Sequence, residues 1–184
     1  MDGCIVRYER EGYAGEEPPF LKKNGHYFGN LKPDENMLEL MYRLYLMQVA
    51  DPESYQVYVL TSIAGGSAIF NEHFHDKIVW LSKYAPYIDI NHVLISVTSK
   101  RDAAEYITNH TITRKDILID DFNRNLNEWV AAGGTAIKYY NGINSPDSFN
   151  GNHLRYDSTT DKNLVSMLVW LTEAGLAGGK DTES

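Results

Sequence analysis

Residues 117–121 read Ile117-Leu118-Ile119-Asp120-Asp121, a short apolar run that ends in two adjacent carboxylates. An apolar, β-branched run of this length predicts a buried strand, and the carboxylates mark the point where it leaves the sheet. Two like charges side by side cost energy unless a cation lies near them, so the pair also predicts a metal site. The stretch therefore indicates both a strand and the chemistry at its carboxyl end.

Other apolar runs along the chain predict strands of the same kind, and amphipathic segments between them predict helices. The predicted strands are 57–60, 93–97, 117–119 and 135–139, and the predicted helices are 34–51, 68–84, 102–109, a segment containing Leu126, Trp129 and Val130, and 160–174. Strands that alternate with helices form parallel sheets whose two faces are covered. The predicted fold class is therefore α/β, with a Rossmann-like parallel sheet flanked by helices.

Length and composition limit the possible classes of protein. A chain of 184 residues with 43% hydrophobic and 23% charged residues fits one folded domain, which we expect over residues 1–174 with a tail at 175–184. A single cysteine excludes a disulfide framework and favours a reducing, cytoplasmic setting. The net charge of −8 argues against nucleic-acid partners, and no apolar run has the length of a membrane span.

Polar groups follow three of the predicted strands. Thr61-Ser62 comes after one strand, Ser99-Lys100-Arg101 after the next and Asp120-Asp121 after the third. The carboxyl ends of parallel strands lie at one edge of a sheet, so we expect a hydroxyl pair, a cationic pair and a carboxylate pair to converge there. Carboxylates can hold Mg²⁺, and the hydroxyl and the lysine can take phosphate oxygens. Taken singly, Thr61-Ser62 also fits a helix N-cap and Lys100-Arg101 a solvated surface.

These motifs resemble those of the haloacid dehalogenase-like hydrolases, most of all the 5′(3′)-deoxyribonucleotidases. Residues 117–121, with Asn125, Trp129 and Gly133-Gly134 after them, resemble motif four of that family. Residues 59–62 resemble motif two, and the opening Met1-Asp2-Gly3-Cys4-Ile5-Val6 resembles motif one. The resemblance extends over about residues 1 to 170, and it implies a Rossmann-like domain with a reduced or absent cap.

The resemblance also implies a covalent mechanism with two aspartates. One family aspartate attacks phosphorus, and the aspartate two residues later acts as general acid and base. Asp2 matches the second position, where its backbone carbonyl would also bind Mg²⁺. The nucleophile would stand immediately before Met1, so we expect the native protein to begin upstream of this residue.

The remaining roles are implied in the same way. Asp121 matches the metal ligand of motif four, supported by Asp120 and Asn125. Thr61 would hold the phosphate through its hydroxyl, with Ser62 beside it. Lys100 matches the motif-three lysine that neutralises the phosphate, and Arg101 and Lys115 are alternatives to it.

We therefore expect a Mg²⁺-dependent phosphoric monoester hydrolase that acts on a small phosphorylated substrate such as a nucleoside monophosphate. Two alternatives remain open: a domain of the same fold that binds a phosphorylated ligand without turnover, and a receiver-like signalling domain. Residues 8–32 are expected to form a long loop or small lid. Its aromatic residues either cover the core or stack on a base: Tyr13, Phe20, His26, Tyr27 and Phe28. The sequence leaves the oligomeric state open.

Overall fold

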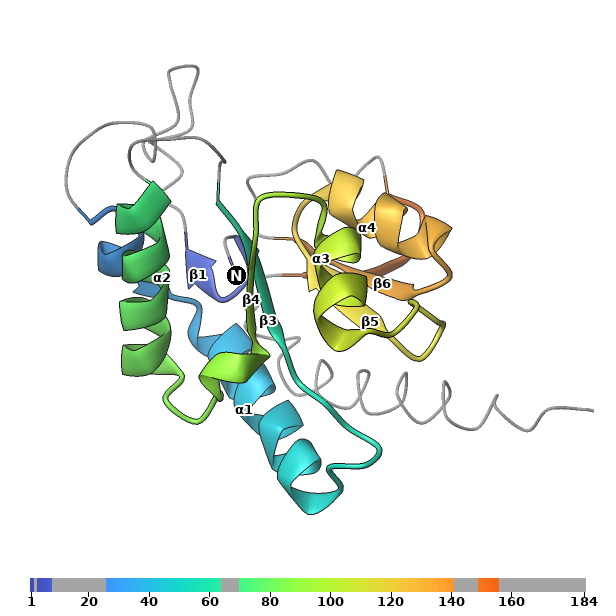
Figure 1. Ribbon diagram of the computed structural model, residues 1–184, viewed down its shortest axis with the longest axis horizontal. Coiled ribbons are helices and arrows are strands. Elements are labelled where there is room, and N and C mark those ends of the chain that lie inside the picture. Colours follow the sequence, from blue (N-terminus) through green and yellow to red (C-terminus); the bar gives the residue numbers. More distant parts are fainter. Residues whose placement is uncertain (2, 8–25, 64–69, 141–148, 156–184) are drawn as a thin grey trace, which may run out of the picture. The chain divides into compact units, whose positions relative to one another are not determined.

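A computed structural model describes residues 1, 3–7, 26–63, 70–140 and 149–155 (Figure 1). The chain divides into two compact units, Met1–Thr108 and Asn109–Ser184. The predicted single domain over 1–174 stays a prediction, because two compact units can belong to one domain. Asp2, most of the predicted lid at 8–32 and the predicted helix at 160–174 lie outside the described residues. None of the described helices is long and apolar enough to cross a membrane.

The described residues of the first unit form two short sheets and three α-helices. Its elements are β1 (Val6–Arg7), η3 (Phe28–Asn30), β2 (Lys32–Pro33), α1 (Glu35–Ala50), β3 (Val59–Ser62), α2 (Phe70–Tyr84), η4 (Ile90–His92), β4 (Val93–Ser96) and α3 (Lys100–Thr108). β3 and β4 pair in parallel, with Thr61 opposite Ile95 and Ser62 opposite Ser96, and β1 and β2 pair antiparallel. β3 thus begins and ends two residues later than predicted, which makes Thr61-Ser62 the last residues of the strand.

The second unit contains β5 (Ile117–Asp120), α4 (Asn123–Ala131), β6 (Thr135–Tyr140) and β7 (Asn152–Arg155). The three strands are parallel in the order β5-β6-β7, and Asp120 lies opposite Lys138. The predicted α/β class, with parallel strands and flanking helices, is confirmed in both units. β7 was not predicted.

Local sequence explains where helix α1 begins and ends. The Asp34 side chain accepts a hydrogen bond of 3.2 Å from the Met37 amide, which satisfies an otherwise unpaired donor in the first turn. Pro52 lacks the amide that a continuing helix needs, and α1 ends at Ala50. Both ends agree with the sequence prediction.

Helix α2 buries only some of the apolar residues that its sequence makes available for a buried side, among them Phe74, Val79, Trp80 and Leu81. Trp80 and Leu81 are buried, but Phe74 and Val79 are 44% and 47% exposed. The buried positions are His73, Asp76, Lys77, Trp80 and Leu81, which recur at helical spacing along one stripe. The prediction failed at Phe74 and Val79 because polar residues share the buried stripe. His73, Asp76 and Lys77 have partners on the segments that α2 packs against. The Trp80 indole likewise donates to the Leu31 carbonyl at 2.8 Å.

The turn from α4 to β6 depends on Gly133 and Gly134. Gly133 has a φ of +100°, a left-handed conformation that ends the helix at little cost only for glycine. The Trp129 indole donates to the Asp116 carbonyl at 2.9 Å and covers Gly134. A Cβ at Gly134 would overlap the indole ring and stand 2.8 Å from Cγ2 of Ile112. Gly134 is therefore required by close packing rather than by its φ angle.

We expect Gly134→Ala to lower the free energy of unfolding by about 1–3 kcal/mol, because the new methyl group overpacks the indole. Urea denaturation measures the change. In a Trp129→Ala background the same substitution should cost less, since the overlapping ring is absent. An equal cost in both backgrounds would show that the indole is not the cause.

Candidate functional site

The carboxyl end of β3 holds a hydroxyl and a buried ammonium group. Thr61 is fully buried, and its Oγ1 accepts a hydrogen bond of 2.8 Å from Nζ of Lys77. The same Nζ donates to the Ser62 carbonyl at 2.8 Å, while the rest of Ser62 is exposed. Hydroxyl and ammonium groups are the ones that bind phosphate oxygens. Of the predicted site residues, Thr61 and Ser62 are therefore held together by a lysine that the sequence analysis did not select.

Lys77 reaches β3 from the buried stripe of α2. Its ammonium group also lies 4.3 Å from the centre of the Phe28 ring, a distance at which a cation is attracted to an aromatic face. The Phe28 ring in turn meets the His73 ring edge to face at 4.9 Å. Phe28 is buried in these contacts, so it covers the core. The stacking role considered for this ring is not supported.

The three basic residues proposed for motif three occupy different settings. Lys100 begins α3, directly after the turn that follows β4, and is 8% exposed. Arg101 pairs with its neighbour Asp102 through a hydrogen bond of 2.8 Å from Nε. Lys115 precedes the amino end of β5, whereas Asp120 forms its carboxyl end. Lys100 therefore lies where the prediction put it, after the carboxyl end of β4. Arg101 is paired with Asp102, and Lys115 lies before a strand rather than after one.

In the second unit, Asp120 is the last residue of β5, Asp121 follows it directly, and both are buried. One oxygen of Asp120 accepts from the Phe122 amide at 2.8 Å, and both accept from the Asn125 amide at 3.2–3.3 Å. The predicted support of this turn by Asn125 thus has a geometric basis. The carbonyl of Asp121 accepts a hydrogen bond from Lys138, whose side chain is fully buried.

The Asp120-Asp121 turn offers the oxygen ligands that Mg²⁺ prefers. Asp120 is held by the amides of Phe122 and Asn125, so its carboxylate is oriented before any ion binds. Lys138 brings a positive charge to the same turn, and part of the carboxylate repulsion is offset without a metal. The donor set fits Mg²⁺, with Asp121 as the residue that would hold it and Asp120 beside it.

The first residues form a turn at the carboxyl end of β3. The amino group of Met1 donates to the Leu60 carbonyl at 3.1 Å, and the Met1 carbonyl accepts from the amides of Cys4 and Ile5 at 3.1 Å. Gly3 has a φ of +75° in this turn, which favours glycine. Met1 therefore lies next to Thr61 in the chain fold. Asp2, the predicted general acid and base, lies outside the described residues.

A second group of polar side chains lies elsewhere in the first unit and was not predicted. Nδ1 of His26 lies 2.7 Å from Oδ1 of Asp76, and the His26 amide donates to Glu72 at 2.9 Å. The hydrogen bond and the charge of Asp76, with a smaller contribution from Glu72, raise the pKa of His26 above its ordinary value of 6.5. The sequence gives little indication of this group, because His26 is 46 positions from Glu72 and 50 positions from Asp76.

Comparison of the chain with protein-family models, with curated protein sequences and with solved structures found no match. Any functional interpretation therefore rests on the residues and contacts described above.

The His26–Asp76 pair predicts a pH dependence of stability. The pKa of His26 is higher in the folded protein than in the unfolded chain, so the stabilisation is complete below about pH 6.5 and is lost as pH rises through the folded pKa. His26→Gln should therefore destabilise the protein more at about pH 5.5 than at about pH 8.5. Urea denaturation in a chelating buffer measures both differences. Equal losses at the two pH values would contradict the pair.

Proposed function

We propose that this protein binds and hydrolyses a small phosphoric monoester, of which a nucleoside monophosphate is the leading candidate, with Mg²⁺ as cofactor. The observation that carries the proposal is the contact between Lys77 and the Thr61 hydroxyl at the end of β3. Parallel sheets bind their ligands at the carboxyl ends of strands. A buried ammonium and a hydroxyl at that position suit a doubly charged phosphate better than a neutral or cationic ligand.

Each residue has a separate role in the proposed reaction. Thr61 and Ser62 donate hydroxyl hydrogen bonds to phosphate oxygens, and Lys77 positions the Thr61 hydroxyl. Lys100 neutralises the phosphate from the first turn of α3. As the motif-one resemblance implies, the family's nucleophilic aspartate, two residues before the position of Asp2, would attack phosphorus while Asp2 protonates the leaving oxygen. Asp2 would then take a proton from the water that hydrolyses the aspartyl-phosphate. In the second unit, Asp121 with Asp120 in support would hold the Mg²⁺ that the proposed activity requires.

The second candidate is a domain of the same fold that binds a phosphorylated ligand without hydrolysing it. The fully engaged Asp120 carboxylate and the buried Lys138 favour it, because they keep the β5 turn ordered whether or not a reaction follows. For both candidates we propose a reducing cytoplasmic setting, in line with the single cysteine of the sequence, Cys4, which is buried.

Phosphate release distinguishes the two candidates. We expect nucleoside monophosphates to be hydrolysed in Mg²⁺ and not in excess chelator, by the chain together with any in-frame residues that its gene encodes before Met1. Thr61→Val should lower kcat/KM by about ten- to a hundredfold, the value of a hydrogen bond to a charged group. Asp121→Asn should abolish the Mg²⁺-dependent release, because it removes the residue proposed to hold the ion.

Two matched variants serve as controls for these substitutions. Thr108→Val removes a hydroxyl that bonds only within α3, and Asp116→Asn removes a carboxylate at the opposite end of β5. Neither should change phosphate release. Binding of inorganic phosphate without release would favour the second candidate, and the absence of both would refute the proposed function.

Lys77→Met provides a test of the positioning role. Without the ammonium group the Thr61 hydroxyl loses the donor that orients it, so we expect inorganic phosphate to bind at least about tenfold more weakly. Isothermal titration calorimetry measures the affinity. Lys83→Met removes a lysine from the last turn of the same helix, where it contacts only the Tyr84 ring among its described interactions, and should leave the affinity unchanged.

A further inference from the structure

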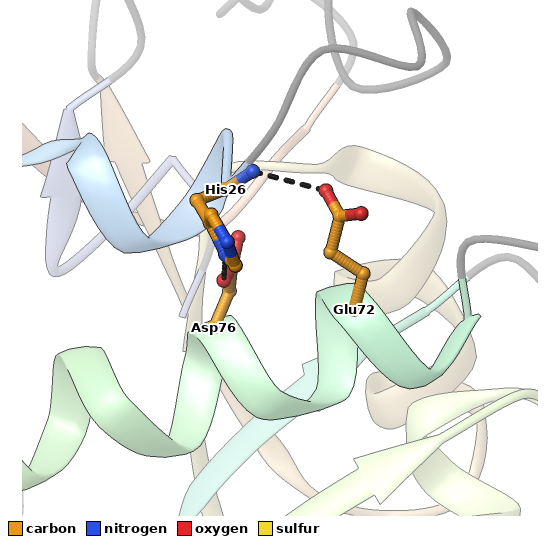
Figure 2. Close-up of side chains that lie close together, drawn as sticks. All are labelled: His26, Glu72 and Asp76. Atoms are coloured by element: carbon orange, nitrogen blue, oxygen red, sulfur yellow. Dashed lines mark hydrogen bonds and ion pairs between the residues drawn. The ribbon is translucent and has the colours of Figure 1, made fainter.

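His26, Glu72 and Asp76 form a cluster in the first unit. Glu72 and Asp76 lie one turn apart on α2, and both side chains rise toward His26, which precedes η3 (Figure 2). The imidazole nitrogen and one oxygen of each carboxylate all lie within 4.8 Å of one another. His26 has a φ of +63°, a conformation that non-glycine residues rarely adopt. The His26 amide donates to Glu72 and its Nδ1 lies against Asp76, so backbone and side chain of His26 both contact α2.

Asp76 is a buried carboxylate with one oxygen outside any hydrogen bond. The residue is 2% exposed, and its Oδ2 has no hydrogen-bond partner among the described residues, although Oδ1 is paired with His26. A buried carboxylate oxygen without a partner is costly, and native structures rarely leave one. Gly29 faces the same carboxylate: a Cβ there would stand 3.4 Å from Oδ1 and 3.7 Å from Oδ2. The glycine therefore keeps the space beside both oxygens free of a side chain.

A second histidine–aspartate pair in this protein, His110 and Asp116, shows an aspartate with several hydrogen-bond partners. Nε2 of His110 lies 3.0 Å from Oδ2 of Asp116. That same oxygen also accepts from the amide and the hydroxyl of Thr113, at 2.7 and 2.8 Å. Asp116 is a turn residue whose hydrogen bonds explain its position. Asp76 is more deeply buried and has fewer partners, so the His26 pair alone does not account for it.

We propose that His26, Glu72 and Asp76 form a binding site for Zn²⁺. Zinc takes imidazole nitrogen and carboxylate oxygen ligands at about 2.0–2.2 Å, so ligand atoms in a tetrahedral site lie about 3.4 Å apart. The separations here extend from 2.7 Å between His26 and Asp76 to at most 4.8 Å, and small side-chain rotations bring them to that value. Water supplies the fourth ligand on the side of His26, whose side chain is 65% exposed.

The chemistry of the ligands favours zinc over magnesium. An imidazole nitrogen suits Zn²⁺ and its neighbours among the first-row metals, whereas Mg²⁺ binds oxygen ligands almost exclusively. Binding requires the neutral imidazole, so the proton between Nδ1 of His26 and Oδ1 of Asp76 passes to solvent as the Nδ1 lone pair binds the ion. Both carboxylates bind in their ionised forms, and no redox step is involved.

The ion would fasten one segment of the chain onto α2. It would join His26 to residues 46 and 50 positions later, in addition to the Trp80–Leu31 hydrogen bond that already holds the segment. Lys77 follows Asp76 directly and orients the Thr61 hydroxyl. Zinc would therefore stabilise the helix that positions the proposed phosphate-binding residues, without itself touching the phosphate.

Titration of the full chain with Zn²⁺, followed by calorimetry, tests the site. We expect one ion per chain, with an affinity that His26→Gln and Glu72→Gln each lower at least about tenfold. Asp76→Asn should do the same, but Asp76 is buried, and the half-buried Glu72 keeps the test valid if that variant fails to fold. His110→Gln serves as the matched control and should bind zinc as the wild type does.

Co²⁺ provides a second readout through its visible absorption, which should show imidazole and carboxylate ligation and should persist in excess Mg²⁺. Equal zinc affinity in the wild type and His26→Gln, or no binding up to about 1 mM, would overturn the proposal. The result is independent of the proposed hydrolase activity, because zinc binding is measured without substrate. Phosphate release that depends on Mg²⁺ could therefore be present or absent with either outcome.

Discussion

The ammonium group of Lys77 connects three elements of the first unit. It rises from α2, bonds the Thr61 hydroxyl and the Ser62 carbonyl at the end of β3, and lies over the Phe28 ring of η3. Lys77 is fully buried, and removing a charge from water is costly unless such contacts replace hydration. The position of the helix relative to the strand end is therefore constrained by this one group, and the orientation of the Thr61 hydroxyl follows from it.

The second unit uses a comparable arrangement. Lys138 is fully buried within β6, opposite Asp120 in the strand register, and bonds the Asp121 carbonyl. Lysine is among the residues least often found inside a protein. In each unit the ammonium group of a buried lysine meets the end of a parallel strand, which is hard to explain by packing, since an apolar residue would fill the same volume at lower cost. Buried charges at strand ends are instead typical of sites that bind charged ligands.

Much of the fold could be predicted from local sequence. The apolar strands, the Asp34 cap and the Gly133 stop are local signals, and β4, β5 and β6 lie within a residue or two of the predicted ranges. The buried face of α2 could not be predicted, because its identity depends on partners distant in the chain. Hydrophobicity favoured Phe74 and Val79 over Lys77 and Asp76, which are buried where they meet Thr61 and His26.

The candidate site divides in the same way. Thr61, Asp120 and Asp121 were found because they stand at the ends of recognisable strands, a feature that periodicity reveals. Lys77 and Lys138 were missed for the same reason, since they lie inside a helix and a strand and reach the strand ends only through their side chains. A lysine on the apolar stripe of a helix, or within an apolar strand, is the signal that could have identified them.

Helix α2 carries Asp76 and Lys77 as consecutive residues, and this adjacency has a mechanical consequence. Neighbouring positions on a helix point about 100° apart, so the two side chains must address different elements. Asp76 faces His26 and Gly29, while Lys77 faces the end of β3. A rotation of α2 about its axis would disturb both contacts together. A contact that holds Asp76 against His26 therefore also holds the Lys77 ammonium group, which donates to the Thr61 hydroxyl. The two contacts are coupled through the helix, although they share no partner.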